Sequence, residues 1–228
     1  MIRSNRMFVI PFLLVLIFLS AAYAQFRNGN DHLGVYSVSS VGNAPNLKWK
    51  FAANGAVRSS PSLSGSDIVF GSSDGSCYCL SMEGKERWKF IADGPVSSSP
   101  AIDHGTVYFS SRANTIYAVA MKTGTVVWKK SLGTPLPYEW GFDYYVSSPS
   151  VDHENIYIGS ADGYMYSLNR KNGKQQWTFN TGSVIRSTPA VDSDNVYFGN
   201  CAGKIYSLDK STGTLQWEFS SAGDTLIN

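Results

Sequence analysis

The chain has 228 residues, of which 43% are hydrophobic, 14% are aromatic and only 16% are charged, and its formal net charge is +2. Arg3 and Arg6 account for this surplus, because the rest of the chain carries 17 basic and 17 acidic residues. A neutral body excludes a broad basic surface for nucleic acid or anionic lipid, so we expect neither as a partner.

The first 24 residues are typical of an export signal. Arg3 and Arg6 precede an apolar run over residues 8–19, and Ala22-Tyr23-Ala24 resembles a cleavage site. The run is short for a bilayer span, so we predict a cleaved signal over residues 1–24 and a mature chain from Gln25; an uncleaved amino-terminal anchor is the alternative. No cysteine lies at the cleavage point, which disfavours a lipoprotein. The predicted location is periplasmic or secreted, with no stable membrane insertion.

A repeat begins after a leading segment at residues 25–47. Its period is about 40 residues, which is typical of propellers. The recurring tryptophans are Trp49, Trp88, Trp128, Trp177 and Trp217. A serine or threonine before proline recurs with the same period, at Ser60-Pro61, Ser99-Pro100, Ser148-Pro149 and Thr188-Pro189.

Each repeat predicts four short strands. The first (A) surrounds the Ser-Pro pair, the second (B) is an apolar run such as residues 68–70, the third (C) contains a tyrosine such as Tyr78, and the fourth (D) contains the tryptophan. Asp74-Gly75 and Asp162-Gly163 suit two-residue hairpins between strands B and C. The predicted repeats are residues 53–91, 92–131, 146–180 and 181–220.

This pattern predicts an all-β fold, a β-propeller of four-stranded antiparallel blades with about four blades present. Stacked blades bury both faces of their inner strands, which explains the continuous apolar B runs. Proline has no N–H group and is tolerated on the free inner edge facing the channel, so the Ser-Pro repeat is structural.

The segment Ser207–Trp217 resembles the tryptophan-docking motif of the pyrroloquinoline quinone (PQQ) type propeller family. Residues 118–128 and 167–177 are looser copies, and residues 26–34 resemble the segment that often precedes the first blade. The resemblance implies that the five tryptophans dock between neighbouring blades, with no role in chemistry. It also implies a ring of seven or eight blades.

The predicted strands do not close a ring. Four A–B–C sets accompany five tryptophan strands, because Trp49 precedes any A strand. We therefore expect the sequence to be part of a longer chain. The alternative is a homodimer of two half-rings, since an open arc exposes apolar blade faces and strand edges.

Two features are candidates for a binding site. An insertion lengthens the connection between Trp128 and Pro149, and in it Tyr138, Glu139, Trp140, Asp143 and Tyr144 form a possible ligand or partner loop, with aromatic rings able to stack on a sugar. The alternative is a loop that folds onto the adjacent blade. Arg58 and Arg186 lie at equivalent positions before their prolines and suit a carboxylated ligand at the channel mouth, unless they are solvated or paired with acids.

No catalytic constellation, metal site or cofactor site is predicted. His104 and His153 recur in A–B turns without a neighbouring nucleophile, and residues 192–195 form a polar turn that lacks the later ligands of a calcium loop. Cys77, Cys79 and Cys201 are an odd number, so small buried residues are favoured over a disulfide framework, although Cys77 and Cys79 could approach disulfide geometry.

The resemblance implies an exported, non-catalytic scaffold in the bacterial envelope that binds a protein or a polysaccharide. In this interpretation the chain is similar to the propeller subunit of the outer-membrane β-barrel assembly machinery, except that the lipoprotein cysteine is missing. The alternative is the amino-terminal part of a PQQ- and calcium-dependent alcohol or sugar dehydrogenase. The chain shows no adjacent cysteine pair, no recognisable calcium-ligand set and no haem-attachment motif, so catalysis is not predicted and PQQ and calcium belong to that alternative only.

Overall fold

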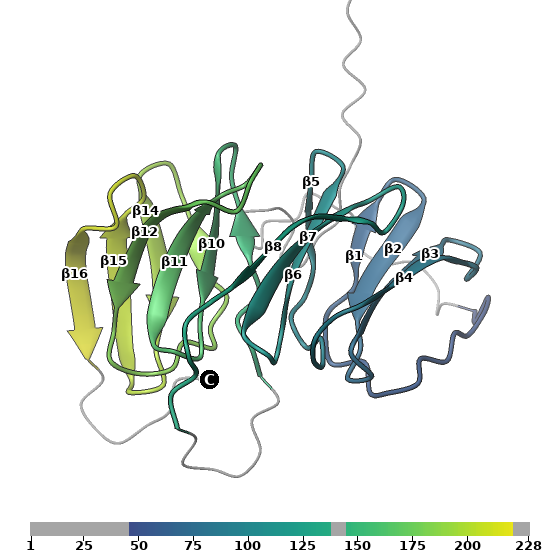
Figure 1. The fold of residues 1–228 in the computed structure, drawn as a ribbon, viewed down its shortest axis with the longest axis horizontal. Helices are drawn as coiled ribbons and strands as arrows, with labels where there is room; N and C mark the ends of the chain where they lie inside the picture. Colours follow the sequence, from purple (N-terminus) through teal and green to yellow (C-terminus); the bar gives the residue numbers. More distant parts are fainter. Residues whose placement is uncertain (1–45, 138–144, 221–228) are drawn as a thin grey trace, which may run out of the picture.

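The computed structural model describes residues 46–137 and 145–220. In these ranges the chain forms sixteen strands and no helix, arranged as four antiparallel sheets of four strands each (Figure 1). The predicted all-β fold with four blades is therefore confirmed. No helix in these two ranges is long and apolar enough to span a membrane.

Each sheet is one blade whose strands are adjacent in chain order. Blade 1 consists of β1 (Ser62–Ser64), β2 (Asp67–Gly71), β3 (Ser76–Ser81) and β4 (Glu86–Ile91). Blade 2 consists of β5 (Ala101–Asp103), β6 (Thr106–Ser111), β7 (Thr115–Ala120) and β8 (Val126–Ser131). Blade 3 consists of β9 (Ser150–Val151), β10 (Asn155–Gly159), β11 (Tyr164–Asn169) and β12 (Gln175–Asn180). Blade 4 consists of β13 (Ala190–Val191), β14 (Asn195–Gly199), β15 (Lys204–Asp209) and β16 (Leu215–Ser220).

The blades stand side by side in an arc, from blade 1 in blue to blade 4 in yellow (Figure 1). The first strands of neighbouring blades, β1 and β5 and then β5 and β9, contact one another, so they form the inner edge of the arc. The fourth strands form the outer edge. All B–C turns lie at one end of the strands, and all A–B and C–D turns lie at the other.

The core lies in layers between blades. One layer joins the inner strands of blades 1 and 2 through Val69, Cys79 and Phe109, and equivalent layers fill the two following junctions. A fourth layer packs Trp49 and Phe51 of the segment before β1 against blade 1. Because both faces of β3 and β7 are covered, nearly every side chain on these strands is buried, as the continuous apolar runs predict.

Four tryptophans dock on the following blade by one geometry. Each indole Nε1 donates a hydrogen bond to a backbone carbonyl of the next C–D turn, from Trp49 to Met82 (2.8 Å), Trp88 to Met121 (2.7 Å), Trp128 to Arg170 (3.0 Å) and Trp177 to Lys210 (2.9 Å). The indole covers a glycine of the same turn. At Gly213, which has φ +73°, a Cβ atom would lie 2.6 Å from the Trp177 ring, so only glycine fits.

The inner edge is held together by serine hydroxyls at the Ser-Pro repeat. The backbone N–H of Ser60 donates to Ser99 Oγ at 2.9 Å, and the N–H of Ser99 donates to Ser148 Oγ at 2.8 Å. Each of these serines precedes a proline, which has no N–H of its own to offer. The hydroxyls therefore link blades where the backbone has lost a donor, in agreement with the predicted structural role.

The B–C turns differ from the two-residue hairpins that the sequence suggested. In blades 1 and 3 the turn contains four residues, 72–75 and 160–163, and among their residues only Gly75 (φ +86°) and Gly163 (φ +87°) have positive φ. The aspartates instead cap their turns, since Asp74 Oδ1 accepts a bond from the N–H of Ser76 at 2.9 Å. A four-residue turn is stable here because the aspartate side chain accepts a hydrogen bond from a backbone N–H group of the turn.

Candidate functional site

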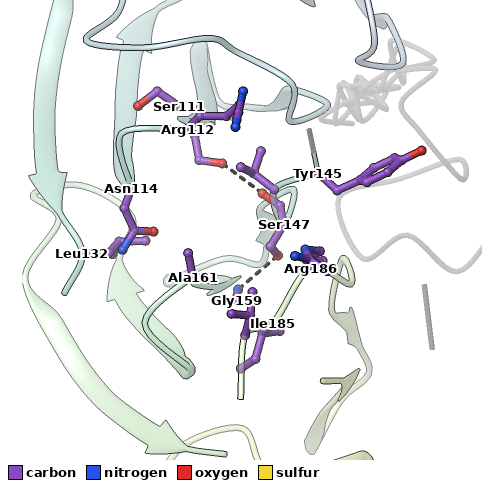
Figure 2. Close-up of a pocket in the computed structure, with 13 residues that line it drawn as sticks. Ser111, Arg112, Asn114, Leu132, Tyr145, Ser147, Gly159, Ala161, Ile185 and Arg186 are labelled. Carbon is purple, nitrogen blue, oxygen red and sulfur yellow. Dashed lines mark hydrogen bonds between the residues drawn. The ribbon is translucent and has the colours of Figure 1, made fainter. Parts of the chain in front are cut away.

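A small pocket opens on the face that carries the B–C turns, among blades 2, 3 and 4. Arg112 of the β6–β7 turn, Arg186 of the segment before β13 and Tyr145 of the segment before β9 are among the residues that line it (Figure 2). The pocket has a volume of about 20 Å³, which is room for about one water molecule. Its lining residues include no aspartate, glutamate, histidine or cysteine.

The turn that presents Arg112 is fixed by backbone and amide bonds. The N–H of Arg112 donates to the carbonyl of Pro95 in the preceding connection at 2.8 Å. Asn114 has φ +58°, and its side-chain amide donates to the carbonyl of Gly133 at 2.6 Å and accepts from Ser160 Oγ at 3.0 Å. This asparagine takes the left-handed conformation that glycine takes in blades 1 and 3, and it ties blade 2 to blade 3.

Ser147 forms the floor of the pocket. Its hydroxyl accepts a bond from the N–H of Gly159 at 3.1 Å and donates to the carbonyl of Ser187 at 2.8 Å, while its own carbonyl accepts from Ser110 Oγ at 2.9 Å (Figure 2). Three blades therefore converge on one buried serine. These bonds hold the backbone segments that line the pocket in place.

The two arginines predicted as a pair are not brought together in this pocket. Arg186 lines it and donates from Nη1 to Cys201 Sγ at 3.3 Å, whereas Arg58 is exposed on blade 1 and is not a lining residue. Arg112 of blade 2 is the second arginine in the lining. Sequence reasoning missed Arg112 because no other B–C turn has an arginine at this place, so the repeat gave no signal.

The beginning of the insertion is anchored on blade 3. Leu132 is buried, the N–H of Gly133 donates to Tyr166 Oη at 3.1 Å, and the N–H of Leu136 donates to the carbonyl of Ala161 at 2.9 Å. Tyr145, at the end of the insertion, is 71% exposed and lines the pocket. The predicted partner residues Tyr138, Glu139, Trp140, Asp143 and Tyr144 lie outside the described residues.

A hydrogen bond between Tyr166 and Asp162 orients the phenol that accepts the bond from Gly133. Tyr166 Oη donates to Asp162 Oδ2 at 2.5 Å. Burial, with the neighbouring carboxylate, raises the pKa of Tyr166 to about 12. The phenol therefore keeps its proton at neutral pH and serves as a donor, and the contact is structural.

His104, His153 and two of the cysteines lie elsewhere. His104 is mostly exposed in the β5–β6 turn, where Nδ1 lies 2.8 Å from Asp103 Oδ2, and His153 is exposed in the β9–β10 turn. None of the three cysteines forms a disulfide, and Cys77 and Cys79 are buried between blades 1 and 2. Burial raises the pKa of the Cys79 thiol to about 12, so this thiol stays protonated and inert.

The described pocket does not fit a calcium–quinone pair. Calcium takes six to eight oxygen ligands, commonly carboxylates, and no carboxylate lines the pocket. No group of three acidic, histidine or cysteine side chains suited to a metal occurs within residues 46–137 and 145–220. No reaction step through a quinone follows from these residues. Two guanidinium groups, a phenol and serine hydroxyls instead suit hydrogen bonds to an anion.

Comparison with known proteins identifies the repeat. A family model described as outer membrane protein assembly factor BamB matches residues 37–140 and 142–227. No curated protein matches the chain at a significant level.

Solved structures show the same fold. BamB from Moraxella catarrhalis superposes with a TM-score of 0.65 at 20% identity, over 78% of this chain and 54% of that one. Quinohemoprotein alcohol dehydrogenase from Comamonas testosteroni gives 0.60 at 14% identity, over 73% and 35%, and a europium-containing methanol dehydrogenase gives 0.63 at 14%, over 77% and 44%. The chain thus spans about half or less of each of these proteins, and the likeness is one of fold.

Proposed function

Since the chain belongs to the family of the outer membrane protein assembly factor BamB, we propose that it is an exported, non-catalytic propeller scaffold that binds a protein partner in the bacterial envelope. The contact surface in this proposal is the face with the B–C turns. The observation that supports it is a pocket that Arg112 and Arg186 line from different blades, with no acidic residue in the lining. The predicted export signal agrees with an envelope location.

The chemistry of the pocket favours an acidic segment of the partner. A guanidinium presents five N–H donors in a planar fork, a geometry that suits a carboxylate. The pocket is too small for a whole side chain but admits a carboxylate oxygen at its mouth. Exposed Tyr145 adds an aromatic contact at the rim, as is common at protein interfaces.

The test is crosslinking of the full chain in a periplasmic extract, followed by affinity measurement with the captured protein. Replacing both arginines (Arg112→Ala with Arg186→Ala) removes charge-assisted hydrogen bonds and should weaken binding about tenfold or more. Arg87→Ala is the matched control, because Arg87 is an exposed arginine on β4. Equal loss in the control, or no loss in the double variant, would contradict the proposal.

A second variant separates the pocket from the inserted loop. Trp140→Ala should weaken the same crosslink if the predicted aromatic loop contributes to the contact. Capture of a polysaccharide by the unaltered chain, with no protein partner, would count against a protein-binding scaffold. So would a saturable change in quinone absorbance on titration with PQQ and calcium, which would favour the dehydrogenase alternative.

A further inference from the structure

A groove opens between blades 3 and 4 at the end of the strands that carries the A–B and C–D turns. It has a volume of about 450 Å³, which lies within the range of small-ligand sites. Its lining includes Asp152, His153 and Glu154 of the β9–β10 turn, and Lys210 and Ser211 of the β15–β16 turn. We call it the blade 3–4 groove. It lies at the opposite end of the strands from the arginine-lined pocket.

The preceding junction shows what the equivalent position binds. Between blades 2 and 3, Nη1 of Arg170 in the β11–β12 turn donates to Oδ2 of Asp103, which is the residue equivalent to Asp152. The same Nη1 lies 2.8 Å from His104 Nδ1. The Arg170 and Asp103 side chains are only 12% and 13% exposed, so the guanidinium is buried against the carboxylate. The chain thus contains its own example of guanidinium recognition at a blade junction.

Lys210 does not reproduce this contact in the next junction. It has the position of Arg170, three residues before the turn glycine, but its Nζ donates to the backbone carbonyl of Asp192 in its own blade at 3.1 Å. The distance from Nζ to Asp152 Oδ2 is 3.5 Å, which is longer than an ordinary hydrogen bond. A compact ammonium also lacks the planar fork of a guanidinium. The carboxylate equivalent to that of Asp103 therefore borders an open groove in place of a buried guanidinium.

Asp152 is an ionised acceptor at the edge of the groove. Its Oδ1 accepts hydrogen bonds from the N–H groups of Glu154 at 2.9 Å and Asn155 at 2.8 Å. Its Oδ2 accepts one from Tyr157 Oη at 3.0 Å. Burial opposes ionisation, but these hydrogen bonds outweigh it and lower the pKa of Asp152. The side chain is still 21% exposed, so a ligand in the groove can reach the carboxylate.

The groove has a second carboxylate that the preceding junction lacks. Glu154 is exposed and lies where blade 2 has Gly105. Two carboxylates and the ammonium of Lys210 give the described lining a net charge of −1 with His153 neutral. A cation is therefore favoured over an anion, and a guanidinium has enough N–H donors for both carboxylates.

We propose that the blade 3–4 groove binds the guanidinium of an arginine side chain from a partner protein, with Asp152 and Glu154 as acceptors. The donor in the preceding junction is itself an arginine of a polypeptide, which favours a protein side chain over a free guanidine. The groove shares no lining residue with the pocket of Arg112 and Arg186, so either proposal can fail without the other.

The test is a titration of the full chain with N-acetyl-arginine amide, followed by NMR through the backbone N–H signals of Glu154 and Asn155. Both groups donate to Asp152 Oδ1, so both respond when the carboxylate binds a cation. Their signals should shift with a dissociation constant of about 1 mM, as expected for a ligand of this size. The citrulline analogue, which has the same shape without the charge, and the lysine analogue should each bind at least about fivefold more weakly.

Variants of the groove test the comparison with the preceding junction. Lys210→Arg places a guanidinium of the chain itself beside Asp152 and should weaken binding of the arginine probe about tenfold by competition. Glu154→Gln removes one acceptor charge and should weaken binding about threefold. Glu83→Gln is the matched control, because Glu83 is an exposed acid in a C–D turn at the same end of the strands, and it should leave the affinity unchanged.

The contrary outcomes are distinct. The NMR spectrum itself shows whether each protein is folded, so signals that do not shift at about tenfold the expected dissociation constant would overturn the site. Undiminished binding by Lys210→Arg would contradict the equivalence with Arg170. Equal binding of the lysine analogue, or equal weakening in Glu83→Gln, would show attraction of any cation and overturn guanidinium recognition. Tighter binding of free L-arginine than of the amide probe would overturn the protein source and assign the groove to the free amino acid.

Discussion

Trp177 and Trp217 are nearly identical within their own blades and differ in what lies beyond them. Each is opposite a serine of the neighbouring strand, Ser167 or Ser207, and each lies about 6 Å from a tyrosine ring of its own blade, at 5.9 and 6.0 Å between centroids. Yet Trp177 is 8% exposed and Trp217 is 47% exposed. The burial of a docking tryptophan is therefore determined by the following repeat.

The sharpest test of this comparison removes each indole in turn. Trp177→Ala should lower the free energy of unfolding by about 3–5 kcal/mol, because it empties a buried site between blades 3 and 4. Trp217→Ala should cost less than about 1 kcal/mol, because little of its burial would be lost. Urea denaturation of the two variants measures both, and similar losses would mean that the exposed indole is buried in solution.

A smaller effect isolates the glycine beneath Trp177. Gly213→Ala combines a positive φ of +73° with a Cβ only 2.6 Å from the indole and should cost about 2–3 kcal/mol. Gly105→Ala is the matched control, because Gly105 has φ +74° with nothing within 4 Å of the added Cβ, and it should cost about 1 kcal/mol. If the two variants have equal midpoints in urea, indole contact adds nothing to backbone strain.

The smallest effect concerns pH. Hydrogen bonds from Ser211 and Thr212 lower the pKa of Asp209, in the C–D turn that receives Trp177, to about 2. A lowered carboxyl pKa stabilises the fold above the unfolded value of 3.8, and this contribution is lost as the pH falls from about 4 to about 2. Fluorescence-monitored urea midpoints should decline over this range, and less steeply in Asp209→Asn. Parallel curves for the two proteins would show that this turn does not contribute.

Much of the fold could be predicted because each blade is defined by residues that lie close together in the sequence. The tryptophan period, the Ser-Pro pairs and the glycines define each blade from within about 40 residues. The four-residue B–C turns could not be predicted from Asp-Gly alone, since Asp74 caps its own turn through the N–H of Ser76. That bond depends on the backbone path of the loop and not on the dipeptide.

The site was less predictable because Arg112, unlike Arg186, does not follow the repeat. Arg112 belongs to a turn whose asparagine replaces the usual glycine, and Arg186, which lines the same pocket, is two blades away in sequence. The Asp103–Arg170 pair joins residues that only the stacking of blades brings together. An alignment of the repeats position by position would have shown that an aspartate in one repeat is accompanied by a cation in the C–D turn of the next repeat. The spacing of the tryptophans and prolines does not contain this signal.

The docking contacts all point forward along the chain, from Trp49 to Met82, from Trp88 to Met121, and onward to Lys210. During synthesis, each blade therefore leaves the ribosome with its indole uncovered until the next blade has been made. The aggregation-prone surface would move along the nascent chain one blade at a time, in place of accumulating over the whole length. Vectorial synthesis thereby limits the exposed apolar surface to about one blade face at any moment.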